Sequence, residues 1–253
     1  MKSFPSKEFI MCWSGEASFG LAAVGLGSTA YATYKEESKE LVIPLGYFSL
    51  MELLQGFTYT WIDQCSLPVN QILTLLGFLH IAFQPFFINL ISMYFIPIQV
   101  KERIQGFVYA ICFITSILMI LQMYPYDWGK PCNIGENALC GKRLCSVSGS
   151  WHIAWEVPTT HIVNLFSIST KGYMPYIFSA FFLPVLYGSW RITLYHWLVG
   201  PTLAAMTTSN PNEWPAVWCL FSIGLLLVMI KTPLRRILPV KKWYFFSYPW
   251  VSR

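Results

Sequence analysis

Two pairs of polar side chains lie inside stretches of sequence that are otherwise apolar. Glu52 and Gln55 are three residues apart, and His80 and Gln84 are four apart, so each pair shares one face of a helix. Glu16 lies inside the first apolar stretch. Ionisable groups in such stretches commonly mark a substrate path or a proton relay. We therefore expect these five residues in a polar substrate-binding pocket, with Glu52 as the relay or ligand and His80 as its nearest partner.

The segment 131–161 gathers further polar and aromatic side chains. It reads PCNIGENALCGKRLCSVSGSWHIAWEVPTTH and holds three of the seven cysteines and two of the four histidines. If residues 151–169 are helical, His152 and Glu156 share a face because they are four apart. We add Trp151, His152 and Glu156 to the expected substrate-binding set. A tryptophan here also fits an anchor at the membrane boundary.

A zinc site is the alternative use of the histidines. Zinc needs three or four nitrogen, oxygen or sulfur ligands, and His80, His152 and His161 could supply them. However, the chain has no HxxxH, HExxH or CxxC spacing. We favour no metal and no cofactor, with zinc as the alternative. No G-x-S-x-G, P-loop or dinucleotide fingerprint identifies a catalytic residue, so enzymatic activity stays open.

Five cysteines are candidates for disulfides, because they fall on one side of the predicted membrane topology. They are Cys12, Cys65, Cys132, Cys140 and Cys145. Cysteines on the outer side of a membrane can pair in an oxidising compartment. A disulfide-stapled outer lid is therefore one explanation of the 131–161 segment. The spacing alone leaves the connectivity open.

The composition indicates a membrane protein. Of the 253 residues, 55% are hydrophobic and only 11% are charged, and the mean hydropathy is +0.49. Soluble domains carry about 25% charged residues. The net charge of +5 comes from residues outside the apolar stretches, which favours a basic membrane face over nucleic-acid binding. The expected partners are the lipid bilayer and a small-molecule ligand, with the oligomeric state open.

The apolar stretches predict an all-α polytopic membrane helix bundle with about seven transmembrane helices in a single domain, 1–253. The expected spans are 9–34, 41–62, 69–96, 104–123, 173–187, 192–206 and 214–230. Residues 124–170 form a Cys-rich loop, in which 151–169 is either an interfacial helix or the outer half of a span interrupted by Pro158. Residues 231–253 form a basic, aromatic cytoplasmic tail. Ser14, Ser18 and Ala22 give the first span a small-residue face for close packing.

The distribution of lysine and arginine predicts the orientation. With seven spans, eleven of these residues lie on the side of the C-terminus and six on the side of the N-terminus. The positive-inside rule then places the C-terminus in the cytoplasm and the N-terminus outside.

Three motifs resemble an uncharacterised family of small polytopic membrane proteins. They are MCWSGEAS (11–18), ELLQ (52–55) and WHIAWEVP (151–158). The resemblance would cover most of the chain, and it carries over no known activity. Seven spans with histidine and glutamate in the outer half also resemble the membrane hydrolases that include alkaline ceramidases. This chain lacks the HxxxH pair that those enzymes carry on their last helix.

These patterns support three functional hypotheses. The first is a transporter of a small polar or amphipathic solute, with Glu52 and His80 on its path. The second is a membrane-embedded, metal-dependent lipid hydrolase. The third is a structural or assembly factor of a membrane complex. We rank the transporter first because no metal motif is present.

Overall fold

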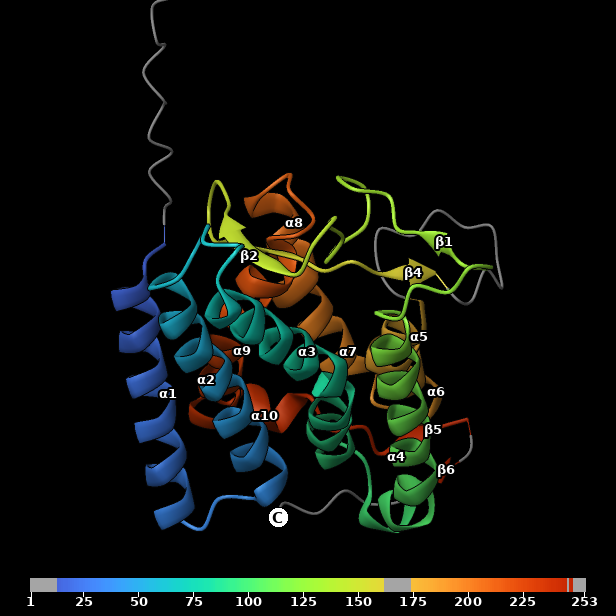
Figure 1. Ribbon diagram of the computed structural model, residues 1–253. Helices are drawn as coiled ribbons and strands as arrows, with labels where there is room; N and C mark the ends of the chain where they lie inside the picture. Colours follow the sequence, from blue (N-terminus) through green and yellow to red (C-terminus); the bar gives the residue numbers. More distant parts are fainter. Residues whose placement is uncertain (1–12, 162–173, 245, 248–253) are drawn as a thin grey trace, which may run out of the picture.

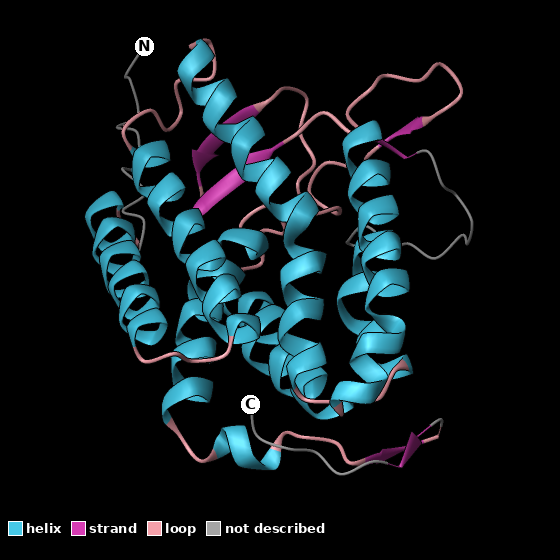
Figure 2. Cartoon of the chain, turned by 90° about the horizontal axis from the view of Figure 1, so that it is seen from below, coloured by secondary structure: helices cyan, strands magenta, loops and turns pink. Residues whose placement is uncertain are grey.

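The computed structural model describes residues 13–161, 174–244 and 246–247, which are mostly helical (Figures 1 and 2). Short connections join the first four helices, so successive helices run in opposite directions along the bundle. These helices are α1 (Gly15–Tyr34), α2 (Lys39–Tyr59), α3 (Pro68–Tyr94) and α4 (Ile98–Leu121).

The next two helical segments each contain a π turn. One consists of α5 (Met174–Ile177), η1 (Phe178–Phe182) and α6 (Leu183–Leu186), and the other of α7 (Trp190–Trp197), η2 (Leu198–Thr202) and α8 (Leu203–Thr207). The amide of Leu183 donates to the carbonyl of Phe178, five residues back. Pro184 and Pro201 favour this widening, because proline lacks an amide hydrogen and crowds the preceding turn. The last helices are α9 (Trp214–Lys231) and α10 (Leu234–Ile237).

Three short antiparallel strand pairs lie at the two ends of the bundle (Figure 1). Residues 122–161, here called the lid, contain two of them: β1 (Lys130–Pro131) with β4 (Thr160–His161), and β2 (Cys145–Ser148) with β3 (Ile153–Glu156). The third pair, β5 (Lys242–Trp243) and β6 (Phe246–Ser247), belongs to the C-terminal tail at the opposite end.

The strand β3 corrects one expectation from the sequence. Residues 153–156 pair with β2 and do not form the interfacial helix or span that we considered for 151–169. Ile153, Ala154 and Trp155 are all buried, although successive side chains of a strand point to opposite faces. Burial of three consecutive side chains is typical of a strand covered on both faces. Residues 162–169 lie outside the described residues.

Small residues bring α1 and α2 close together, as the sequence predicts. Ser18, Ala22 and Gly25 are buried on α1. A Cβ atom added to Gly25 would lie 2.1 Å from the hydroxyl oxygen of Ser49 on α2. The backbone of α1 therefore contacts a side chain of α2 directly. Small residues allow the same close approach between helices in membranes.

One hydrophobic core runs through the helices and into the lid. Trp155 of β3 is 1% exposed and packs on α3, where a Cβ atom at Gly77 would lie 3.3 Å from its ring. In the part of the chain that the structure describes, four helices are long and apolar enough to cross a membrane, namely α2, α3, α4 and α9.

The tail closes the end of the bundle away from the lid. Arg235 donates to the hydroxyl of Tyr94 at 2.7 Å and to the carboxylate of Glu37 at 2.6 Å. Lys101 pairs with Glu40 at the same end. Gly188 has a positive φ of 103°, and a Cβ atom there would lie 2.9 Å from Phe246 of the tail hairpin. A side chain at this position would be both strained and crowded.

Candidate functional site

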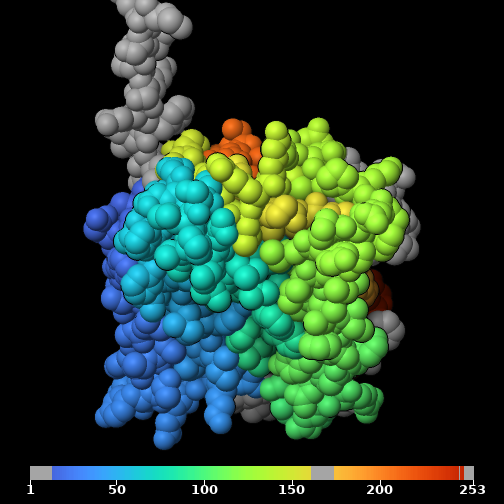
Figure 3. Space-filling model, in the orientation of Figure 1, coloured from blue at the N-terminus to red at the C-terminus, as the bar shows by residue number. Residues whose placement is uncertain are grey.

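The lid is stapled by two disulfides. Cys65, between α2 and α3, pairs with Cys145 of β2, and Cys132 pairs with Cys140 inside the lid. The Cα atoms are 5.1 and 5.9 Å apart, which is ordinary disulfide geometry. These are four of the five cysteines that we expected to pair, and Cys12 lies outside the described residues. Figure 3 shows the lid as a yellow and green layer across one end of the bundle.

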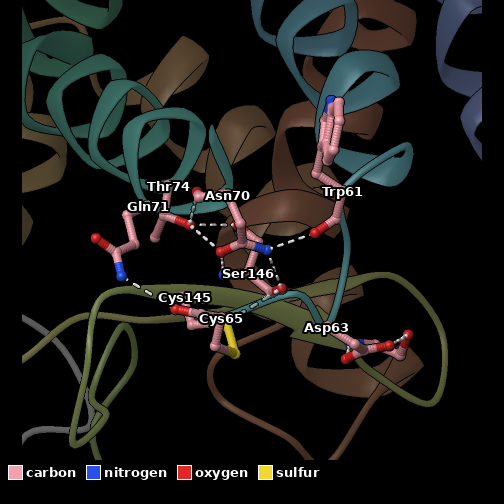
Figure 4. Close-up of a disulfide and its surroundings, with 9 residues drawn as sticks. Trp61, Asp63, Cys65, Asn70, Gln71, Thr74, Cys145 and Ser146 are labelled. Atoms are coloured by element: carbon pink, nitrogen blue, oxygen red, sulfur yellow. Dashed lines mark hydrogen bonds between the residues drawn. A yellow bond between two sulfur atoms is a disulfide. The ribbon is translucent and has the colours of Figure 1, made fainter. Parts of the chain in front are cut away.

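Asn70 at the start of α3 holds the lid beside the first disulfide (Figure 4). Its amide nitrogen donates to the carbonyls of Trp61 at 2.8 Å and Ser146 at 2.9 Å. Its amide oxygen accepts from the backbone amide of Ser146 at 3.0 Å, and the hydroxyls of Thr74 and Ser146 are 2.8 Å apart. These buried bonds fix β2 on the end of α3.

Glu213, just before α9, clamps the other side of the lid. Its carboxylate accepts from the backbone amides of Ser150 at 3.0 Å, Trp151 at 2.8 Å and His152 at 2.9 Å, although the side chain is fully buried. A Cβ atom at Gly149 would lie 2.3 Å from the carboxyl carbon, so only glycine fits there. The sequence patterns did not identify Glu213. The one signal is an acidic residue two positions before a proline where the last apolar stretch begins.

His152 is part of this clamp and is neutral. Its Nδ1 accepts from the amide of Ile153 at 2.8 Å and lies 3.2 Å from the hydroxyl of Tyr59. Burial lowers the pKa of His152 to about 3. Trp13 stacks on both Trp151, at 6.3 Å between ring centres, and His152, at 5.9 Å. Trp151 and His152 therefore pack the lid against Trp13, just before α1, and neither is a lining residue of the pockets described here.

Glu52 and Gln55 share the buried face of α2 that their spacing predicts. Both side chains are fully buried, and the amide of Gln55 has no hydrogen-bond partner among the described residues. Ser18 on the facing side of α1 interacts with the carboxyl group, and Tyr59 lies further along the same face. The arrangement is a sealed polar cluster at the lid end of α2.

His80 lies elsewhere, which corrects its expected pairing with Glu52. Its ring stacks on Tyr47 with 3.8 Å between the ring centres, and Tyr47 also stacks on Phe87 at 3.5 Å. His80 lines an open aromatic groove with Phe83 and Phe86. Spacing along one helix could not reveal that Tyr47 covers this face.

The remaining predicted site residues do not lie together in one pocket. Glu16 is exposed in the first turn of α1. Glu156 is half-buried on β3. It lies so close to the lid backbone that a Cβ atom added to Gly141 would be 2.3 Å from the Cβ atom of Glu156. Among the eight predicted residues, Gln84 is the one that lines the large pocket described next.

A pocket of about 440 Å³ lies between the lid and the helices, at the lid end of the bundle. Ala138 and Leu139 of the lid line it, together with residues from five helical segments. Its walls are aromatic and aliphatic, with Trp197, Trp214 and Trp218 among them. We expected a pocket under this loop with a polar lining, and the lining is instead apolar.

One polar group marks the inner end of the pocket. The hydroxyl of Tyr176 donates to the amide oxygen of Gln84 at 2.6 Å, and the amide nitrogen of Gln84 donates to the thiol sulfur of Cys219 at 3.1 Å. An amide nitrogen carries two hydrogens, so Gln84 keeps one for a ligand. Thr202 lines the same pocket.

The pocket wall is built on the π turn η2. Pro201 and Thr202 of η2 line the pocket, and a Cβ atom at Gly200 would lie 2.5 Å from the indole nitrogen of Trp218. That nitrogen donates to His196 at 2.9 Å. π turns often mark functional sites in helical proteins. Here Gly200 of the π turn, which has no side chain, lets Trp218 approach the helix backbone.

No group of three His, Cys, Asp or Glu side chains that could hold a metal comes together within residues 13–161, 174–244 and 246–247. His80 and His152 lie in separate environments, and the side chain of His161 lies outside the described part. The zinc alternative therefore has no ligand set among the described side chains.

Comparison with known proteins gives a family but no activity. A family of unknown function, DUF5765, matches residues 16–239. The chain belongs to this family. No curated protein and no solved structure matches the chain.

The DUF5765 region contains both parts of the candidate site. It spans the described helices from Glu16 to the end of α10, the lid with its disulfides, and Glu213. The tail hairpin β5–β6 follows the region. The sealed cluster and the apolar pocket thus lie in the part of the chain that defines the family.

Proposed function

We propose that this DUF5765 protein is an integral membrane protein with seven spans. Four helices have the length and hydropathy of spans. α1 has 20 residues and packs along α2, while the segments 174–186 and 190–207 pack with α9 and α3 in the same bundle. A spanning helix needs about 20 residues, and α1 and the segment 190–207 approach that length, whereas the segment 174–186 is a shorter apolar helix. The three further segments complete the seven.

The proposed orientation puts the lid outside and the C-terminus in the cytoplasm. Among the described residues, ten lysines and arginines lie at the end away from the lid and three at the lid end. The positive-inside rule makes the richer end cytoplasmic. Both disulfides are at the other end, where an oxidising compartment would preserve them. Two independent chemical signals therefore agree.

We infer that the protein is a transporter of a neutral, amphipathic small molecule, which binds in the 440 Å³ pocket. One observation carries this inference: the pocket is lined mainly by apolar and aromatic side chains, with few polar groups among them, namely Gln84 with Tyr176, and Thr202. No charged side chain is among the described lining residues. Ligand pockets of 300–1,000 Å³ with few, well-placed polar groups are the usual sites for small molecules.

This lining supports an amphipathic solute over a small polar one. A polar solute would lose its hydration against apolar walls without compensation. A molecule with an aliphatic or flat body and one hydroxyl or carbonyl would fill the pocket and reach the free amide hydrogen of Gln84. The location just under the lid suits a binding site that is loaded from the outer side.

Photolabelling tests the proposal. A long-chain alcohol carrying a diazirine would be added to the purified protein, and the labelled peptides would be identified by mass spectrometry. Ala205→Trp would fill the pocket, because Ala205 lines it. Ala110→Trp is the matched control, because Ala110 is exposed on α4.

We expect labelling around α8 and the start of α9 in the wild type and in Ala110→Trp, and its loss in Ala205→Trp. An unlabelled alcohol should compete, whereas an alkylamine of the same length should not. Equal labelling of the two tryptophan variants would rule out the pocket as the binding site.

A further inference from the structure

The buried face of α2 carries a carboxyl group that pairs with no cationic side chain among the described residues. The side chain of Glu52 is fully buried, and among the described residues only the hydroxyl of Ser18 lies close enough to interact with its carboxyl group. The amide of Gln55, one turn away on the same face, is also fully buried and without a partner. Buried polar groups are almost always satisfied, so the carboxyl group of Glu52, with a single hydroxyl beside it, and the unpartnered amide of Gln55 point to a missing ligand.

We propose that Glu52 and Gln55 form a binding site for one small monocation, either a proton or a sodium ion. A bare carboxylate in an apolar interior is too costly to persist, and one positive charge removes that cost. The Gln55 amide adds a neutral oxygen atom to the charged oxygens of the carboxylate. Oxygen atoms are the ligands that alkali cations prefer.

The neighbours of Glu52 are polar or weakly acidic, so they do not supply the charge. Ser18 of α1 is a neutral hydroxyl that already accepts from the indole of Trp13 at 2.8 Å. Tyr59 on α2 and Cys219 on α9 are the titratable groups that interact electrostatically with Glu52. Both are neutral when protonated.

More distant charges are already engaged. His152 of the lid is neutral because its Nδ1 accepts the amide of Ile153. Glu213 is satisfied by the backbone amides of the lid. The two described ion pairs, Lys101 with Glu40 and Arg235 with Glu37, lie at the far end of the bundle.

The proposed cation site lies next to the polar end of the pocket. Cys219 interacts with Glu52 on one side and accepts from Gln84 on the other. Binding of a cation at Glu52 would therefore change the electrostatic environment of the Cys219 thiol, and through it the hydrogen bond of Gln84. The inference itself does not depend on what fills the pocket, because it rests on the atoms of Glu52 and Gln55.

Thermal unfolding of the full chain in detergent, followed by tryptophan fluorescence, tests the site. Midpoints would be measured between pH 6 and 9 in choline chloride and in sodium chloride of equal concentration. The variants are Glu52→Gln, which has the same shape and no charge, and Glu16→Gln, a matched control on the exposed face of α1.

In choline, we expect the wild-type midpoint to fall by about 5 °C or more as the pH rises, because Glu52 loses its proton inside the fold. Sodium restores the midpoint at pH 9 if sodium is the natural occupant, and has no effect if the proton is. Glu52→Gln should be insensitive to both, and Glu16→Gln should behave as the wild type. Identical responses of Glu52→Gln and the wild type would overturn the proposal.

A measurement on the wild type alone guards against a variant that fails to fold. The infrared carbonyl band of a protonated carboxylic acid should be present at pH 6 in choline and absent at pH 9. Absence of this band at pH 6, together with no effect of sodium on the midpoint, would also overturn the proposal.

Discussion

The hydroxyl of Tyr176 donates to the amide oxygen of Gln84 across 2.6 Å and thereby orients the amide at the inner end of the apolar pocket. This bond fixes which way the amide points, because its oxygen is occupied by Tyr176 and its nitrogen by Cys219. The remaining amide hydrogen then becomes the donor that selects a ligand hydroxyl or carbonyl.

Gln84→Leu should weaken binding of the long-chain alcohol about tenfold, since a buried hydrogen bond contributes about 1.4 kcal/mol and leucine makes none. Tyr176→Phe should weaken binding less, because it removes the hydrogen bond that orients the Gln84 amide but leaves the amide in place. Competition of photolabelling by unlabelled alcohol measures both. A Gln84→Leu protein that binds the alcohol as tightly as the wild type would remove the amide from the recognition chemistry.

Glu213→Ala should loosen the lid by at least about 3 kcal/mol, because three backbone amides would lose their buried acceptor. Hydrogen exchange of residues 150–152 should accelerate by more than about a hundredfold. Glu136→Ala is the control, since Glu136 is an exposed lid residue. Unchanged exchange in Glu213→Ala would show that the lid is held mainly by its disulfides.

The two disulfides should differ in their effect on stability. Cys65 and Cys145 are 80 residues apart, whereas Cys132 and Cys140 are 8 apart. Loop-closure entropy predicts losses of about 4.5 and about 2.5 kcal/mol when each pair is replaced by serine. Thermal midpoints of the two double variants measure the difference. A larger loss for the 132–140 pair would contradict the ordering.

His152 should make the protein acid-sensitive. Burial lowers its pKa to about 3 in the folded state, whereas an unfolded histidine titrates near 6.5. The unfolded state then binds more protons, so the free energy of unfolding is highest above pH 6.5 and falls between pH 6.5 and 3, by a few kcal/mol in total.

His152→Asn does not titrate and should flatten this acid limb, and the difference between the two curves isolates His152. The midpoint of thermal unfolding from pH 7 to 4 measures it. An acid limb of the same steepness in both proteins would mean that His152 is solvated at low pH without unfolding.

The features that could be predicted from the sequence depend on local patterns. Apolar stretches predict α2, α3, α4 and α9, because a helix of such residues must be buried or cross a membrane. The spacing of Glu52 and Gln55 predicts their common face. The clustering of cysteines predicts a stapled lid, although the partners of Cys65 and Cys132 depend on the fold.

The features that could not be predicted depend on contacts between distant segments. His80 is not beside Glu52, because Tyr47 of α2 covers its ring. Residues 153–156 form a strand and no helix, because they pair with β2, which is not marked by any short-range signal. Glu213 holds the lid through backbone amides that are 61 residues or more away in the sequence. Tyr176 and Trp218 resemble ordinary apolar residues until the pocket brings them to Gln84.

Native mass spectrometry of the protein released from detergent tests the central claim most directly, because it detects a co-purified molecule whatever its chemical identity. The account predicts one neutral, amphipathic molecule bound to the wild type and to Ala110→Trp, and absent from Ala205→Trp. A wild-type protein that carries no such molecule, or carries the same molecule in Ala205→Trp, would contradict the assignment of the pocket as the binding site.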